Sequence, residues 1–141
     1  EYEMKGVPLR LEIGPKDIEK NQCVIVRRDN LEKMFVSLDD LEKEIPELLK
    51  KVHEGMYQKA LERKNQMTHI AHDFAEFKNI AKNEVGFIKA MWCGDEACED
   101  KVKEVTGVGS RCIPLEQKHI SDKCVCCGKP AKHMVLWGKA Y

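Results

Sequence analysis

Six of the seven cysteines in this 141-residue chain lie between residues 93 and 127. Cys93 and Cys98 form one pair, and Cys124, Cys126 and Cys127 lie together about 25 residues further on. A pair, a gap of this length and a Cys-x-x-Cys-Gly turn are typical of a tetrahedral zinc site made of four thiolates. We therefore expect Cys93, Cys98, Cys124 and Cys127 to bind Zn²⁺, with Cys126 as the alternative to Cys127.

Such a zinc site is expected to be structural. Four thiolates leave no coordination position open for water or substrate. Plain buried cysteines, a redox dithiol and a catalytic thiol stay open as alternatives, although no Cys-x-x-Cys opens a helix after a strand. The chain also contains no Walker loop, Rossmann glycine pattern or Gly-x-Ser-x-Gly elbow. Cys112 and Cys23 lie in apolar segments and are expected to be buried thiols.

Cysteine usage, hydropathy and charge limit the cellular compartment and the kinds of binding partner that we expect. An odd number of clustered cysteines argues against a secreted disulfide framework and for reduced thiols in the cytoplasm. No apolar run approaches the roughly 18 residues of a membrane span. The formal net charge is zero, which gives no support to non-specific DNA binding. The opening segment, residues 1–8, suggests a start inside a larger polypeptide.

The N-terminal part of the chain alternates like short β-strands. Residues 7–13 place Arg10 and Glu12 on the face opposite their apolar neighbours. A helical turn near residue 17, a strand over 22–27 and a less regular strand over 31–36 follow. Strands this short do not bury a core alone, so we expect a sheet that begins upstream of residue 1.

A long amphipathic helix follows these strands. Ser37 is the predicted N-cap, and apolar residues then recur at spacings of three and four as far as Ala60. Pro46 interrupts the run, so we expect a break or kink near residue 45 and helix to about residue 65. The basic outer face is either a solvated surface or a contact for a nucleic-acid backbone. Its residues are Lys50, Lys51, Lys59, Arg63 and Lys64.

The remaining residues predict a small three-stranded sheet with helices, which needs a staple to be stable. The expected elements are a helix capped by Asp73, strands over 87–92, 110–115 and 134–138, and a helix over 95–105 closed by Gly107. His69 and His72 have helical spacing without a metal-binding carboxylate motif, and we interpret them as helix surface.

Several stretches together resemble one family, the prolyl-tRNA synthetases of archaeal/eukaryotic-like type. Residues 3–17, with Gly-Val-Pro-Leu-Arg-Leu-Glu-Ile-Gly-Pro at their centre, are similar to the class II anticodon-binding domain. Residues 91–100, 110–114 and 123–132 are similar to the appended zinc domain, and the closing Trp-Gly-Lys-Ala-Tyr to the terminal signature. Some relatives have a shorter Cys-x-Cys pair, which keeps the choice between Cys126 and Cys127 open.

The resemblance implies a fold class between α/β and α+β. Residues 1–68 would be the C-terminal part of an α/β anticodon-binding domain with a long connecting helix. Residues 69–141 would be a zinc-stapled α+β domain with a three-stranded sheet. The chain would belong to a larger enzyme, a proline–tRNA ligase that activates proline with ATP and esterifies it to tRNA(Pro). The catalytic domain, which would use the ATP and Mg²⁺, is expected outside this chain.

The resemblance also implies site residues and partners. Glu3, Arg10 and Lys16 match the positions that read guanines in the anticodon stem-loop of tRNA(Pro). Arginine and lysine donate to guanine O6 and N7, while a carboxylate accepts from N1 and N2. Tyr141 is implied to dock near the enzyme's own catalytic domain, and the full-length enzyme is implied to be a homodimer.

A freestanding zinc-stapled module that binds protein or RNA is the alternative function. Its partner would dock on the sheet that carries Trp92 and Trp137. One measurement distinguishes this module from the synthetase, namely the affinity of the Arg10→Ala variant for tRNA. Loss of tRNA binding favours the synthetase, and unchanged affinity favours the module. Stoichiometric zinc that leaves only on chelation would exclude a redox protein.

Overall fold

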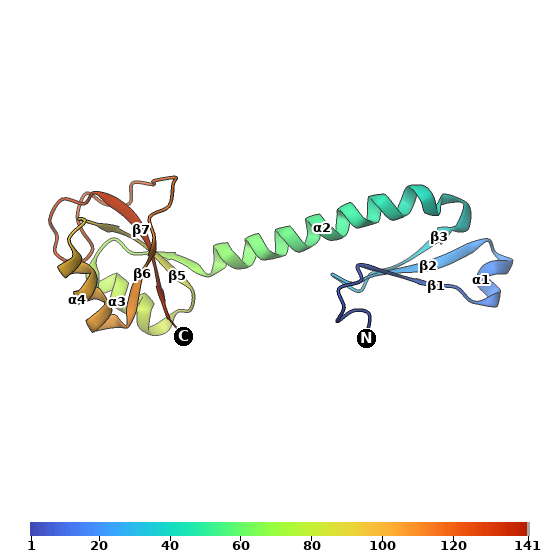
Figure 1. The fold of residues 1–141 in the computed structure, drawn as a ribbon, viewed down its shortest axis with the longest axis horizontal. Coiled ribbons are helices and arrows are strands. Elements are labelled where there is room, and N and C mark those ends of the chain that lie inside the picture. The colour runs from blue at the N-terminus through green and yellow to red at the C-terminus, as the bar shows by residue number, and fades with distance from the viewer. Residues whose placement is uncertain (141) are drawn as a thin grey trace. The chain divides into compact units, whose positions relative to one another are not determined.

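The computed structural model describes residues 1–140, which divide into two compact units (Figure 1). The first unit is Glu1–Glu62 and the second is Arg63–Tyr141. Helix α2 (Leu41–Gln66) therefore begins in one unit and ends in the other. The domain limits given by the sequence, 1–68 and 69–141, stay a prediction.

The first unit is built on a three-stranded antiparallel sheet. Its strands are β1 (Leu9–Glu12), β2 (Gln22–Arg27) and β3 (Lys33–Ser37), in that order, and α1 (Pro15–Glu19) joins the first two. The bounds of β2 are those predicted, whereas β3 begins later than expected. Leu31 has a left-handed backbone with φ 62°, which belongs to the preceding turn and is incompatible with a strand.

The start of the helical segment is where the sequence places it. Ser37 is the N-cap, and its Oγ accepts a hydrogen bond from the backbone N–H of Asp39 at 3.3 Å. A short 3₁₀ turn, η1 (Leu38–Asp40), leads into α2. None of the helices in residues 1–140 is both long and apolar enough to span a membrane.

The break predicted near residue 45 is wrong, because α2 continues through Pro46. Proline lacks the N–H that would pair with the carbonyl of Glu42, so one hydrogen bond is lost near the start of the helix. Leu41 and Ile45, which precede the proline, pack against the core of the sheet. This packing holds the first turn in place despite the missing bond.

The core of the first unit lies between the sheet and the first half of α2. Its buried residues are Cys23, Ile25, Val36 and Leu48. Cys23 is buried as predicted, and burial raises the pKa of its thiol. The apolar stripe of α2 is buried only as far as Val52, since Met56 further along is 47% exposed.

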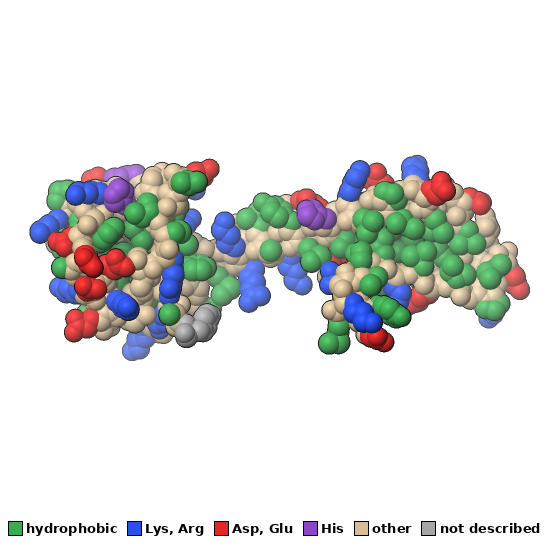
Figure 2. All heavy atoms as spheres, in the orientation of Figure 1, with side chains coloured by type: hydrophobic (Ala, Val, Ile, Leu, Met, Phe, Trp, Pro, Cys, Tyr) green, Lys and Arg blue, Asp and Glu red, His purple; other side chains and the backbone are tan. Residues whose placement is uncertain are grey.

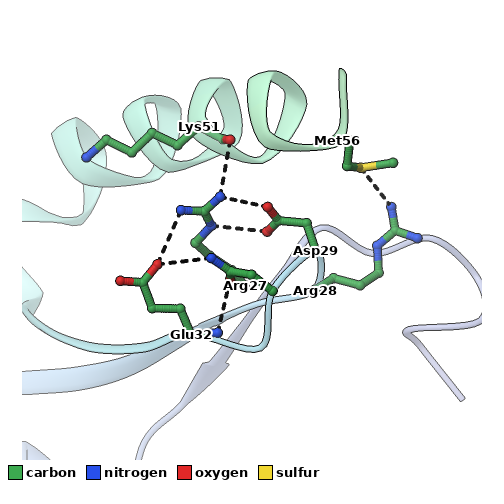
Figure 3. A network of polar contacts seen from close by, with 7 residues as sticks. Arg27, Arg28, Asp29, Glu32, Lys51 and Met56 are labelled. Atoms are coloured by element: carbon green, nitrogen blue, oxygen red, sulfur yellow. Dashed lines mark hydrogen bonds and ion pairs between the residues drawn. The ribbon is translucent and has the colours of Figure 1, made fainter. Parts of the chain in front are cut away.

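A buried charge pair joins the β2–β3 turn to α2 (Figure 3). Arg27 donates from Nη2 and Nε to Asp29, at 2.7 and 3.1 Å, and from Nη2 to the carbonyl of Lys51 at 3.2 Å. The side chains of Arg27 and Asp29 are only 11% and 7% exposed. The hydrogen bond from Arg27 holds the pKa of Asp29 below its ordinary value, so the pair stays charged at neutral pH.

Gly55 is the position of α2 where this pair approaches the helix. A Cβ atom there would lie 2.8 Å from Oδ2 of Asp29 and 3.3 Å from Nη2 of Arg27. A glycine inside a helix costs about 1 kcal/mol relative to alanine. The close approach of the charge pair explains why a glycine stands here.

We predict that Gly55→Ala lowers the free energy of unfolding by about 1–3 kcal/mol, because the new methyl group displaces the buried pair. The same change in an open helix normally stabilises a protein. Urea unfolding followed by circular dichroism measures the difference. In an Asp29→Ala background the closest contact is removed, and Gly55→Ala should then cost much less; stabilisation in the wild-type background would contradict the explanation.

The second unit contains a four-stranded sheet in the order β4-β5-β7-β6. The strands are β4 (Thr68–Ile70), β5 (Phe87–Trp92), β6 (Val108–Cys112) and β7 (His133–Lys139). β4 pairs parallel to β5, and β7 pairs antiparallel to β5 and β6. The predicted three-stranded sheet is therefore corrected to four strands. β4 was missed because three residues are too few to show an alternating pattern.

Two capped helices complete the second unit. Asp73 caps α3 (Phe74–Asn83), and Asp95 caps α4 (Glu96–Thr106), which ends at Gly107 with φ 70°. Phe77 of α3 meets Trp137 of β7 edge to face, with ring centroids 5.8 Å apart. Both side chains are almost fully buried, so this contact lies at the centre of the core.

Two expectations about single residues are wrong. Cys112 is exposed, because the strand is shifted to Val108–Cys112 and Cys112 ends it after a register shift. His69 and His72 do not lie on a helix. His69 is in β4, with Nε2 3.1 Å from the carbonyl of Val85, and His72 precedes α3, with Nδ1 2.9 Å from the carboxylate of Glu76.

Candidate metal centre and nucleic-acid surface

Four cysteine sulfurs come together in the second unit. The Sγ atoms of Cys93, Cys98, Cys124 and Cys127 all lie within 4.8 Å of one another. Cys93 Sγ is 3.7 Å from that of Cys98 and 3.8 Å from that of Cys127. A tetrahedron with Zn–S bonds of about 2.3 Å has sulfur–sulfur edges of about 3.8 Å. The spacing of these thiols therefore fits a zinc ion.

The four cysteines come from two separate parts of the chain. Cys93 directly follows β5, and Cys98 lies in the first turns of α4. Cys124 and Cys127 lie in a turn that is fastened beside the end of β5 by backbone hydrogen bonds. Val125 donates to the carbonyl of Met91 at 2.8 Å, and Lys132 donates to that of Trp92 at 2.8 Å.

A left-handed glycine follows one cysteine of each pair. Gly94 after Cys93 has φ 88°, and Gly128 after Cys127 has φ 72°. No atom lies within 4 Å of a Cβ built on Gly128, so the backbone conformation and not space requires glycine there. The two glycine turns aim the next backbone amides, those of Asp95 and Lys129, at the cysteine sulfurs.

These surroundings shift the pKa values of the thiols in opposite directions. The amide of Lys129 hydrogen-bonds to Cys127 and lowers its pKa to about 7. Burial raises the pKa of Cys98 and, despite the amide of Asp95, that of Cys93. Buried thiols resist ionisation unless a cation compensates the charge. A divalent metal held by the four sulfurs would supply that compensation.

Cys126 lies outside the group of four. Its side chain is partly buried, packs against the cluster and against the hydrophobic core, and has a pKa raised by burial. The geometry thus favours Cys127 over Cys126 as the fourth sulfur, which is the order of preference that the sequence gives.

A second polar group lies on the first unit and contains two of the predicted RNA-binding residues. Arg10 Nη1 donates to Oε1 of Glu3 at 3.0 Å. On its other edge, Arg10 Nε and Nη2 lie 3.0 and 2.9 Å from Oε1 of Glu12. Arg10 and Glu3 are about half exposed, at 50% and 54%, so both side chains are open to solvent.

Strand register sets the face on which these side chains lie. Arg10 is opposite Val26 on β2, and Val26 is opposite Lys33 on β3, so the three share one face of the sheet. Leu9, the neighbour of Arg10, packs with the core on the α2 side. Side chains alternate along a strand, which puts Arg10 on the face away from α2.

The remaining predicted residues have different settings. Lys16 lies exposed on α1, outside the polar contacts of Glu3 and Arg10 among the described residues. Tyr141 lies outside the described residues. The five basic residues of the outer α2 face are exposed, and Figure 2 shows lysine and arginine side chains spaced along this helix. This exposure is compatible with either interpretation of that face.

Two charged residues of the Arg10 group were not predicted. They are Glu12, which forms an ion pair with Arg10, and Lys33, whose Nζ is 3.8 Å from Oε2 of Glu12. The alternation of residues 7–13 does put Arg10 and Glu12 on one face, so the sequence contained that signal. Lys33 comes from another strand, and only the strand register brings it near.

Two family models match this chain. Residues 1–48 match the anticodon binding domain, and residues 74–141 match the C-terminal domain of prolyl-tRNA synthetase. Among curated proteins, a proline--tRNA ligase of Clostridium novyi is 64% identical, and proline--tRNA ligase 2 of Bacillus cereus is 60% identical, each over all 141 residues. The chain spans 30% of the length of each of these relatives.

Solved structures give the same result. A prolyl-tRNA synthetase from Cryptosporidium parvum, complexed with halofuginone and AMPPNP, matches with a TM-score of 0.91 and 37% identity. The same synthetase complexed with L-proline and AMP matches with a TM-score of 0.89 and 36% identity. Each match covers 99% of this chain and 30% of the solved one. Residues 1–141 therefore belong to the prolyl-tRNA synthetase family, as the part that contains the anticodon-binding domain and the family's C-terminal domain.

Proposed function

We propose that this chain gives a proline–tRNA ligase its contact with the anticodon of tRNA(Pro). The observation that supports this most directly is the Arg10–Glu3 pair, which is exposed on one face of the sheet in a region matching an anticodon-binding domain. The ligase would attach proline to tRNA(Pro) with ATP, and its named relatives are proline--tRNA ligases.

The pair has the chemistry that guanine requires. Guanine presents two acceptors, O6 and N7, along one edge and two donors, N1 and N2, along another. In the proposed complex, Arg10 donates to the acceptors and Glu3 accepts from the donors. Lys16 would add a further donor from α1. Adenine reverses the pattern at position 6, so the pair would select guanine.

The four cysteines would hold a structural Zn²⁺. A zinc ion bound by four thiolates offers no open position for a substrate, and its contribution is to folding. Cys93 and Cys98 would tie β5 to α4, while Cys124 and Cys127 would tie the following turn to both. The metal would thus keep the second unit folded around a small core.

The remaining parts of the proposal concern the whole enzyme. We propose that the ligase is a cytoplasmic homodimer whose catalytic domain binds ATP and Mg²⁺. The chain described here would contact that catalytic domain, and Tyr141 would provide one docking group for it.

We predict that Arg10→Ala weakens binding of the proline anticodon stem-loop by about 5- to 150-fold, the range given by one bidentate contact to guanine. Fluorescence anisotropy at fixed salt measures the affinity. The matched control is Arg63→Ala on the exposed face of α2, which removes the same charge. That control should change the salt dependence and leave base preference intact. Equal affinity of Arg10→Ala and wild type would contradict the proposed function.

We also predict that Cys127→Ser lowers zinc affinity strongly, whereas Cys126→Ser leaves one equivalent of zinc bound. The reason is that only Cys127 Sγ lies in the group of four. Elemental analysis after dialysis against a weak chelator gives the zinc content. Zinc affinity should fall as the pH is lowered, because each thiol must lose a proton to bind metal. Full zinc content in Cys127→Ser together with loss in Cys126→Ser would reverse the assignment.

A further inference from the structure

Arg10 is held by two carboxylates that differ in how firmly they are fixed. Glu12 is on the same strand, two residues away, and its backbone pairs with Val24 in the sheet. Glu3 lies in the turn before β1, where Gly6 donates to its carbonyl at 3.1 Å. A paired strand is more rigid than an N-terminal turn. Glu12 is therefore the firmer support for Arg10.

The two contacts also use different edges of the guanidinium. Oε1 of Glu12 lies 3.0 Å from Nε and 2.9 Å from Nη2 of Arg10, which fixes the side edge and the plane of the group. Oε1 of Glu3 takes one hydrogen of Nη1. A guanidinium has five N–H groups, so these three contacts leave one N–H of Nη1 and one of Nη2 free. Two N–H donors of one guanidinium are what O6 and N7 of guanine accept.

The second oxygen of Glu12 is also engaged. Its Oε2 is 3.8 Å from Nζ of Lys33, which approaches from β3. Glu12 therefore has a cation on each side, and its carboxylate has less freedom to turn away from Arg10. The side chain of Glu12 is 41% exposed, so part of this arrangement is shielded from water.

We propose that Glu12 is a positioning residue, which holds the guanidinium of Arg10 so that its two free N–H groups meet O6 and N7 of an anticodon guanine. This inference rests on the proposed function. Glu12 does not touch the base itself. Without it, Arg10 keeps its charge but can rotate toward Glu3, and its free donors no longer have a fixed direction.

Simple electrostatics predicts the opposite effect. Removing a carboxylate from an RNA-binding face reduces repulsion of phosphates and should strengthen binding. A positioning role predicts that Glu12→Ala weakens the recognition of guanine although the face becomes more positive. Glu12→Gln separates the two effects, because its amide oxygen still accepts from Nε and Nη2 while its charge is gone.

The experiment compares the anticodon stem-loop of proline tRNA with the same RNA in which 7-deazaguanine replaces each anticodon guanine in turn. This base lacks N7 and keeps the donors at N1 and N2. Affinities of the full chain for both RNAs are measured at one salt concentration. For wild type we expect the loss of N7 at one position to weaken binding at least about fivefold. The ratio of the two dissociation constants, 7-deazaguanine RNA over unmodified RNA, should approach 1 in Arg10→Ala and Glu12→Ala. Glu12→Gln should keep most of the wild-type ratio.

The controls separate the possible failures. Glu62→Ala removes an equal charge from the exposed part of α2 and should keep the wild-type ratio. Unchanged thermal unfolding shows that Glu12→Ala is folded. A wild-type ratio in Glu12→Ala overturns the positioning role while the proposed function stands. A ratio of 1 in wild type means that Arg10 does not read N7, and this overturns the proposed Arg10–guanine contact together with the inference.

Discussion

The constraint on which the second unit is proposed to depend is a group of four sulfur atoms that lie within 4.8 Å of one another. They come from the end of β5, the first turns of α4 and the turn around residues 124–127, which also share backbone hydrogen bonds and one hydrophobic core. Structural zinc sites contribute roughly 10–16 kcal/mol in small peptides, which is comparable to the total stability of a domain. The proposed zinc ion would stabilise a unit whose core is small and has one aromatic pair at its centre. The proposed RNA chemistry lies elsewhere, on the first unit.

The first unit contains two charge pairs that differ in burial. Arg27 and Asp29 are buried and connect a β-turn to the backbone of α2, and Gly55 leaves the space that they need. Arg10 and Glu3 form a pair of the same chemical type, but they are half exposed on the other face of the sheet. Burial makes the first pair a structural support, because a lost partner leaves an uncompensated charge. Exposure would allow the second pair to exchange partners with a base in the proposed complex.

Much of this structure follows from the sequence. The four clustered cysteines have a recognisable spacing, and β2, β5 and the caps at Ser37 and Asp73 lie where periodicity and capping rules place them. These features are encoded by residues close together in the chain. Cys127 was preferred over Cys126 for the same reason.

The sequence predictions that the structure contradicts depend on tertiary contacts. Pro46 does not break α2, because packing of the preceding turn offsets the lost hydrogen bond. β4 exists only through its pairing with β5, and the environment of Lys33 depends on a register across three strands. Cys112 is exposed because its strand is shifted along β7. Local patterns do not contain this information.

In the proposed complex, Arg10 contacts the acceptor edge of an anticodon guanine. Dimethyl sulfate methylates guanine at N7, so chemical footprinting on proline tRNA reports this contact directly. The chain should protect the anticodon guanines from methylation, and the protection should disappear with Arg10→Ala. If the tRNA is bound but N7 of these guanines stays reactive, the sheet face around Arg10 does not read the anticodon.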